Sequence, residues 1–221
     1  MTLRLNGSTS GYTEIDAPAV AGSNTLVLPT GNGTARQTMM TDGAGVLSFA
    51  SDAGALYYRL NSDFVGTALT NAAQPTFGVG VTLAASTVYA FDSLFALVHV
   101  SGTQTHSMGL SFGGTATVNN IGYSVINKFS LTSLTNNVYT DVSHVFIDTA
   151  ANTTYRAATQ NGFICHVTKL SGTVSINAGG TFIPQYTTST GTGAYTTQAG
   201  SYIRFVPIGA AGSNSSQGTW S

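Results

Sequence analysis

The stretch that decides the fold is residues 161–209, NGFICHVTKLSGTVSINAGGTFIPQYTTSTGTGAYTTQAGSYIRFVPIG. It contains three apolar runs separated by Gly-rich segments, the pattern of short strands joined by turns in an all-β protein. In the middle run, Val174 and Ile176 alternate with small polar residues. Because successive side chains of a strand point to opposite faces, this run has one apolar and one polar face.

The last run, residues 201–208, has apolar side chains on both faces. Ile203 and Phe205 share one face, and Arg204 lies between them on the other. A strand that is apolar on both faces needs cover on both, and a single sandwich covers only one. We therefore expect a second copy of the chain to supply the other cover. The residues expected at this interface between copies are Tyr202, Arg204, Val206 and Ile208.

The composition excludes several classes of partner. The 221 residues suffice for one domain and an appendage. Only 7% of them are charged, against about 25% in average soluble domains. With a net charge of −1, the chain has no electrostatic footprint for nucleic acid or for an anionic membrane. The sequence shows no signal peptide and no long apolar run, so we expect synthesis in the cytoplasm of a bacterial host.

The chain divides into three expected parts. Residues 1–52 contain short β-like pieces between glycines, none long enough to form a core of its own, and we expect an extended N-terminal arm. Residues 53–75 are expected to be a connector, and residues 76–221 a folded body. The arm residues expected to contact a partner are Leu3, Leu5, Tyr12, Ile15, Leu26 and Leu28.

The body has the pattern of an antiparallel jelly roll. Residues 86–100 are apolar on both faces and predict a central strand, or two strands joined by a bulge near Asp92. His106, Met108, Leu110 and Phe112 alternate with small residues, and residues 121–129 and 138–147 predict further strands. Eight or so strands at this spacing fit two four-stranded sheets packed face to face.

Residues with catalytic or metal-binding chemistry give no convincing pattern. Gly109–Gly113 matches the letters of the G-x-S-x-G nucleophile motif, but Ser111 lies in an alternating strand and not at a strand-to-helix turn. The four histidines are not spaced as zinc ligands, and Cys165 is expected to be a buried small hydrophobe. Asp92, an acid inside an apolar strand, is expected at a bulge or paired with Arg204 or Lys128. We expect no catalytic residue, no metal and no cofactor, and hence not an enzyme.

Segments from both ends and the middle of the chain resemble tailed-bacteriophage virion structural proteins, fibre-like proteins above all. These segments are residues 5–33 (LNGSTSGYTEIDAPAVAGSNTLVLPTGNG), 41–50 (TDGAGVLSFA), 110–123 (LSFGGTATVNNIGY), 174–186 (VSINAGGTFIPQY), 199–209 (AGSYIRFVPIG) and 218–221 (GTWS). The resemblance implies a structural protein of the virion. The pattern of the body is also similar to the jelly rolls of the tumour-necrosis-factor-like group, which assemble as trimers.

Together these features predict a capsid decoration (cement) protein that stabilises the phage head as a homotrimer. Its partners would be itself and the major capsid protein or other virion proteins. The alternative is a short tail fibre or receptor-binding protein that recognises the host surface, where exposed tyrosines and small polar residues could bind a host glycan.

Overall fold

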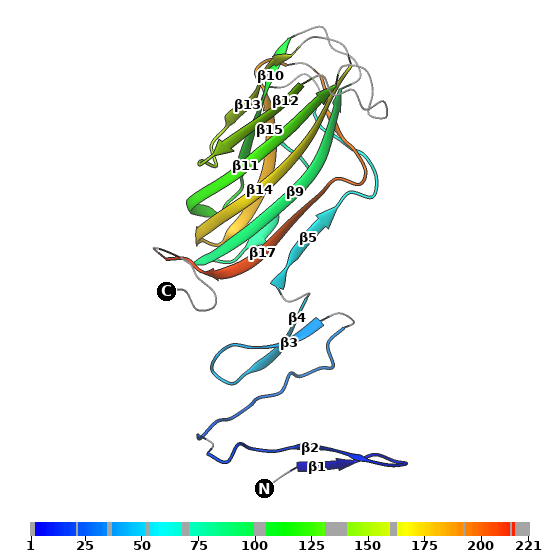
Figure 1. The fold of residues 1–221 in the computed structure, drawn as a ribbon, viewed down its shortest axis with the longest axis vertical. Helices are drawn as coiled ribbons and strands as arrows, with labels where there is room; N and C mark the ends of the chain where they lie inside the picture. Colours follow the sequence, from blue (N-terminus) through cyan, green and yellow to red (C-terminus); the bar gives the residue numbers. More distant parts are fainter. Residues whose placement is uncertain are drawn as a thin grey trace. The chain divides into compact units, whose positions relative to one another are not determined.

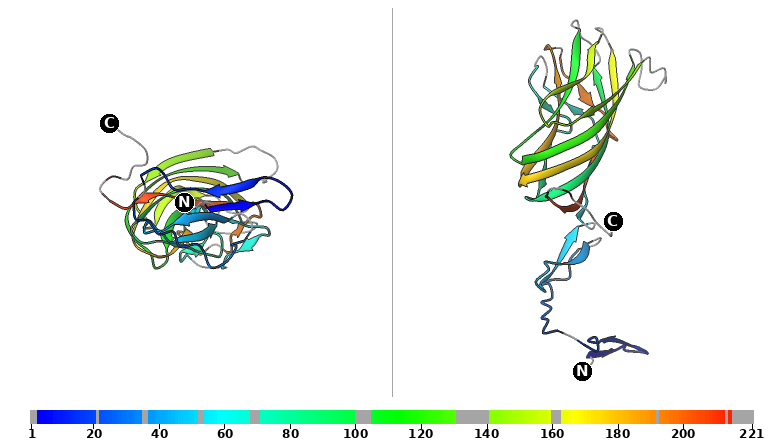
Figure 2. Two further views of the ribbon diagram at one scale, coloured as in Figure 1. Left: turned by 90° about the horizontal axis from the view of Figure 1, so that it is seen from below. Right: turned by 60° about the vertical axis from the view of Figure 1, so that its left-hand side comes forward.

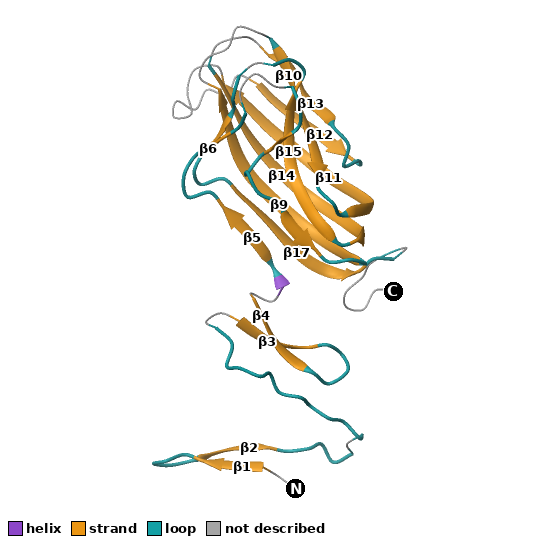
Figure 3. Ribbon diagram, turned by 180° about the vertical axis from the view of Figure 1, so that it is seen from behind, coloured by secondary structure: helices purple, strands orange, loops and turns teal. Residues whose placement is uncertain are grey.

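The structure, a computed structural model, describes residues 3–20, 22–34, 37–51, 54–67, 71–99, 105–130, 141–159, 163–191, 193–212 and 214. These residues form β-strands, turns and loops, with one very short helical segment at Gly54 (Figure 3). No helix in the described ranges has the length and hydropathy to cross a membrane. The chain divides into two compact units, Met1–Ala53 and Gly54–Ser221.

The N-terminal unit contains two hairpins. Strand β1 (Leu3–Asn6) pairs with β2 (Tyr12–Ile15), and β3 (Gln37–Thr41) pairs with β4 (Leu47–Ser51). In the second turn, the Asp42 carboxylate accepts hydrogen bonds from the backbone N–H groups of residues 44 and 46. Most large apolar side chains of the two hairpins are exposed, whereas Leu47 and Phe49 of β4 are half-buried. The unit therefore consists of hairpins without a buried core among its described residues.

The second unit, here called the body, consists of two antiparallel sheets (Figure 1). The large, eight-stranded sheet is formed by β5 (Leu56–Arg59), β6 (Phe64–Val65), β9 (Thr87–His99), β11 (Thr117–Ser130), β12 (Asp141–Ile147), β14 (Ile164–Ala178), β16 (Thr196–Thr197) and β17 (Tyr202–Ala210). The small, five-stranded sheet is formed by β7 (Gln74–Pro75), β8 (Val81–Leu83), β10 (His106–Gly113), β13 (Thr153–Thr159) and β15 (Gly180–Thr188).

The core lies between the two sheets, whose layers can be followed in two further views (Figure 2). Aromatic rings from both sheets contact each other across it. Phe91 of β9 meets Phe112 of β10 edge-on with ring centroids 5.6 Å apart. Phe112 stacks on Phe182 at 4.7 Å, and Phe182 meets Phe205 of β17 at 5.8 Å. These contacts pack the inner faces of the sheets together, and the body is an antiparallel β-sandwich.

The two faces of β17 are divided as the alternation predicts. Ile203 and Phe205 are buried in the core, whereas the side chain of Arg204 lies on the outer face of the large sheet. The predicted central position of residues 86–100 is also confirmed, since β9 lies between β14 and β17. The predicted alternative of a bulge near Asp92 is wrong, because both pairings of β9 run through Asp92 without a shift in register. The irregularity lies instead at Pro207–Gly209 of β17.

Three other expectations differ from the structure. The first and middle runs of residues 161–209 are one strand, β14, which passes through Gly172 without a turn. The two sheets are unequal and not four-stranded. Residues of the expected connector belong to the body, because β5 pairs with β17, β6 with β16 and β7 with β15. Residues 56–58 are apolar and aromatic, a composition that favours a strand, and this strand pairs with β17 and so extends the large sheet.

Candidate functional site

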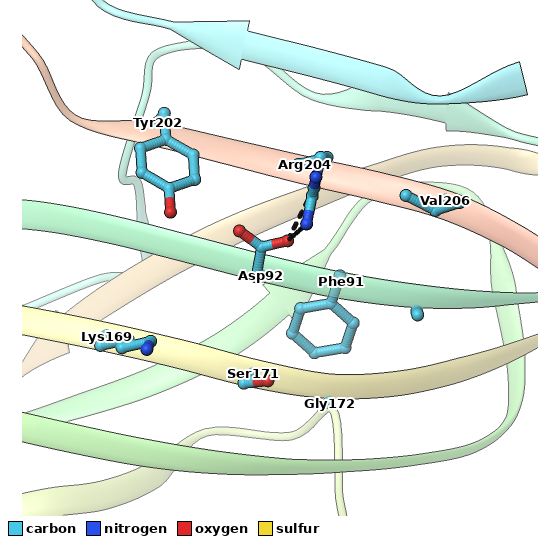
Figure 4. Close-up of a pocket in the computed structure, with 9 residues that line it drawn as sticks. Phe91, Asp92, Lys169, Ser171, Gly172, Tyr202, Arg204 and Val206 are labelled. Atoms are coloured by element: carbon cyan, nitrogen blue, oxygen red, sulfur yellow. Dashed lines mark hydrogen bonds and ion pairs between the residues drawn. The ribbon is translucent and has the colours of Figure 1, made fainter. Parts of the chain in front are cut away.

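A pocket of about 380 Å³ lies on the outer face of the large sheet, over strands β9, β14 and β17 (Figure 4). This volume is within the range of small-molecule binding sites. The pocket is lined by Ala90, Phe91, Asp92, Lys169, Ser171, Gly172, Tyr202, Arg204 and Val206. Most of these side chains are polar or charged, in contrast to the opposite, inner face of the same strands.

The register of the strands explains why these residues come together. Ser171 of β14 lies opposite Asp92 of β9, Asp92 lies opposite Arg204 of β17, and Arg204 lies opposite Tyr57 of β5. Neighbouring strands are about 4.8 Å apart, so residues directly opposite each other on one face are in contact. The four residues therefore form one row across the sheet. Tyr202 lies in the next row, opposite Leu94 of β9.

Asp92 and Arg204 form a cross-strand ion pair within this row. The Nε of Arg204 donates a hydrogen bond to Oδ1 of Asp92 at 2.8 Å, and its Nη2 lies 2.7 Å from the same oxygen. Of the partners that the sequence left open for Asp92, the structure therefore selects Arg204. The side chains are 27% (Asp92) and 52% (Arg204) exposed, so solvent screens the pair in the isolated chain.

Tyr202 forms the aromatic wall of the pocket. Its ring stacks on the ring of Tyr57, with centroids 5.7 Å apart and an interplanar angle of 25°. Partial burial, the negative charge of Asp92 and a hydrogen bond to its carboxylate raise the pKa of the Tyr202 hydroxyl. The phenol therefore stays protonated and can serve as a hydrogen-bond donor to Asp92.

The structure brings three of the four predicted interface residues together. Tyr202, Arg204 and Val206 line the pocket. Ile208 lies farther along β17, half-buried, and is not among the lining residues. Sequence reasoning missed Lys169 and Ser171, which β14 contributes from the other side of β9. Both precede Gly172, and the interpretation of that glycine as a break hid their position in a strand.

Exposed apolar side chains continue across the outer face beyond the pocket. On β12, the edge strand of the large sheet, the side chains of Val142 and Phe146 are 56% and 71% exposed. Leu94, next to the pocket, is also exposed. These three residues lie in different rows of the sheet, and scattered exposed apolar residues are normal on a protein surface. The ring of Phe146 is the largest and most exposed of the three side chains.

The six arm residues singled out by the sequence all lie in the N-terminal unit with exposed side chains. Leu3 and Ile15 are opposite each other in the first hairpin. Leu26 and Leu28 flank Val27, which forms a parallel bridge with Val46. The arm residues are thus divided between two short β-structures, and the structure shows no contact that joins all six.

Chemistry-bearing residues elsewhere in the body are held in structural roles. Ser111 lies inside β10 and its hydroxyl donates to Oε1 of Gln185 at 3.4 Å. This placement confirms that Gly109–Gly113 is a strand and not a nucleophile turn. Cys165 is buried, and burial raises the pKa of its thiol to about 11. Within the described residues, no group of His, Cys, Asp and Glu side chains has the arrangement of a metal site.

Three of the four histidines gather around Tyr195 inside the body, a cluster that the sequence did not reveal. Nε2 of His106 lies 2.6 Å from the Tyr195 hydroxyl, and the rings of His99 and His166 lie 5.0 and 6.1 Å from the Tyr195 ring. Nδ1 of His166 is 3.3 Å from Oδ1 of Asn127, whose amide donates to the hydroxyl of Thr168 at 2.8 Å. The fourth, His144, lies on the outer face and contacts Ser124.

No protein-family model matches the chain, and a search of curated proteins gives no match. The candidate site is therefore interpreted from its geometry.

Proposed function

We propose that this protein is a capsid decoration protein of a tailed bacteriophage, which stabilises the head as a homotrimer. In this proposal the body is a jelly roll that trimerises through the outer face of the large sheet. Residues 1–52 form an arm on neighbouring capsid subunits, and the whole is a non-enzymatic part of the virion.

The observation that carries the proposal is the exposure of the apolar side chains in the N-terminal unit. Most large apolar residues of the two hairpins are more than two-fifths exposed, and Val20, which lies between the hairpins, is 94% exposed. Two-stranded hairpins are at best marginally stable alone in water. An assembly partner that covers these side chains would supply the missing burial, and a capsid surface is such a partner.

The outer face of the large sheet supports the homotrimer. Tyr202, Arg204 and Val206 are alternate residues of β17 whose partly exposed side chains share the outer face, and Leu94, opposite Tyr202, is also exposed. A cyclic trimer would cover this face of each copy with the next one. Each trimer would then present three arms, so that several weak arm contacts combine into one multivalent attachment.

A second candidate function is a short tail fibre or receptor-binding protein. It is favoured by the stacked Tyr57–Tyr202 pair beside charged side chains, because sugar rings stack on aromatic faces and bond to polar groups at their edges. The two candidates differ in copy number per particle. Hundreds of copies would support decoration, and a dozen or two would support a fibre.

Removal of the N-terminal unit tests the proposed role of the arm. A chain that begins at Gly54 is expected to remain a soluble trimer but to lose binding to capsids that lack the protein, measured by co-sedimentation. The full-length chain with Leu5 and Leu28 both replaced by Ser is the matched variant, and it should bind more weakly. If the truncated chain still decorates capsids, the arm proposal is wrong.

A further inference from the structure

The outer face of the large sheet carries two different features that one copy cannot bring together. One is the pocket around Asp92 and Arg204. The other is the exposed ring of Phe146 on β12. Both lie in the same row of the sheet, since Phe146 is opposite Ser124, Ser124 is opposite Ser171, and Ser171 is opposite Asp92. Three strand spacings of about 4.8 Å separate Phe146 from Asp92, so this ring cannot fill the pocket of its own chain.

A cyclic trimer needs such a pair of features. In a threefold ring the contact is heterologous, which means that each copy presents one surface to the next copy and a different surface to the previous one. An exposed aromatic side chain at a sheet edge and an open pocket on the sheet face are two surfaces of this kind.

We propose that Phe146 of one copy inserts into the Asp92–Arg204 pocket of the next copy. This inference rests on the proposed homotrimer and names the contact that holds it together. The ring would lie beside the Tyr202 ring and against the guanidinium of Arg204, in an aromatic and a cation–π contact.

The charges around the two features are complementary. The pocket contains two cations, Arg204 and Lys169, and one carboxylate, Asp92. The end of β12 contributes the exposed carboxylate of Asp148, two residues after Phe146. Beside Phe146 the edge of one copy thus carries a carboxylate, while the exposed cation Lys128 lies opposite Val142, farther along β12. A carboxylate that meets a formally positive pocket favours one relative orientation of the copies.

The position of Phe146 on its own strand also fits this role. Its ring lies over Gly122 of β11, where an added Cβ would come within 3.1 Å of Cζ. The glycine lets the ring rest against the backbone on one side while 71% of the residue remains exposed. A partly supported aromatic ring loses less conformational freedom on binding than a free one.

Cross-linking between single-cysteine variants of the full chain tests the contact. Chains with Phe146→Cys and chains with Val206→Cys are co-expressed with tags of different size and oxidised gently. We expect a covalent product that contains one chain of each tag, and no covalent dimer from either variant alone. The wild-type chain, whose buried Cys165 is its only thiol, is the background control.

Trimer stability provides a second measurement. Phe146→Glu is expected to weaken the trimer at least about tenfold in light scattering at decreasing concentration, as for a buried aromatic at the centre of an interface. Val65→Glu is the matched control, because Val65 is similarly exposed, at 61%, and lies outside the row.

The outcomes separate this inference from the proposed function. A wild-type chain that is monomeric at micromolar concentration would overturn the homotrimer itself. A trimer without the mixed cross-link, or one in which Phe146→Cys links to itself, would overturn only the Phe146 contact. A trimer in which Val206→Cys reacts with a thiol dye as fast as in the unfolded chain would mean that the pocket is open to another ligand, such as a host glycan, and would also overturn it.

Discussion

At the residue scale, the burial of His166 is expected to make the body sensitive to acid. Burial is the main cause that lowers the pKa of His166 from 6.5 to about 3, and electrostatic interactions with Arg156 and His106 contribute to the shift. Between these values the unfolded chain binds a proton that the folded chain excludes. The free energy of unfolding is therefore highest above about pH 6.5, where the ring is neutral in both states, and decreases as the pH falls from 6.5 towards 3.

We expect the free energy of unfolding to decrease by up to about 1.4 kcal/mol per pH unit for His166 alone in this window. Urea denaturation between pH 7.5 and 4 measures the slope. His166→Gln removes the titrating ring and should flatten it. His144→Gln, at an exposed position on the outer face, is the matched control for the substitution. An equal slope for His166→Gln and wild type would contradict the assignment.

Gly172 is required by the space around it and not by an unusual backbone angle. A Cβ at this inward-facing position would overlap the carbonyl oxygen of Gly122 and the backbone of Tyr123 on β11. Because backbone atoms can move aside only at a cost in strain, Gly172→Ala should lower the free energy of unfolding by about 1–3 kcal/mol. Gly212→Ala, where the added atom meets nothing within 4 Å, should be nearly neutral. Equal urea midpoints for the two variants would be incompatible with this packing.

At the element scale, β17 separates folding from association because its two faces have different roles. Phe205 is 1% exposed and contacts Phe91 and Phe182 in the core. Phe205→Ala is expected to lower the free energy of unfolding by about 3–5 kcal/mol. Val206→Ser, one residue away on the outer face, should cost about 1 kcal/mol or less in the monomer. Denaturation of both variants at one concentration measures the difference, and similar losses would show that both faces are buried.

The Asp92–Arg204 pair should contribute little to the stability of an isolated chain. Exposed ion pairs and cross-strand pairs contribute about 0.2–1 kcal/mol. A double-mutant cycle with Asp92→Asn and Arg204→Gln is expected to give a coupling energy in that range for the monomer. A larger value at concentrations where trimers form would be expected if the next copy excludes water from the pair.

At the scale of the whole molecule, the two compact units predict independent folding of the body. The residues of Gly54–Ser221 contain the whole buried core cluster. A chain that begins at Gly54 should therefore melt within a few degrees of the full-length chain, as measured by circular dichroism. A large drop in melting temperature would mean that the N-terminal unit supports the core directly.

Much of the fold could be read from alternation along single strands. The opposite orientations of Ile203 and Arg204, the inward face of β10 and the central position of β9 all follow from a side-chain period of two. Glycine breaks this alternation. In β14, Gly172 interrupts the apolar pattern because Tyr123 occupies the space of its missing side chain, so the sequence predicts two strands where the structure has one. The sequence also gives no sign that residues 56–59 pair with β17, because a short aromatic run predicts a strand but not which distant strand it pairs with.

The sequence by itself determined the all-β class and which side chains of each strand face the core, because both depend on neighbours in the chain. Only the tertiary structure decided that Asp92 pairs with Arg204, that His99, His106 and His166 meet around Tyr195, and that a pocket opens above β9. These features depend on the register between strands distant in sequence. Register is set by the summed packing of the whole core, and no local pattern contains it.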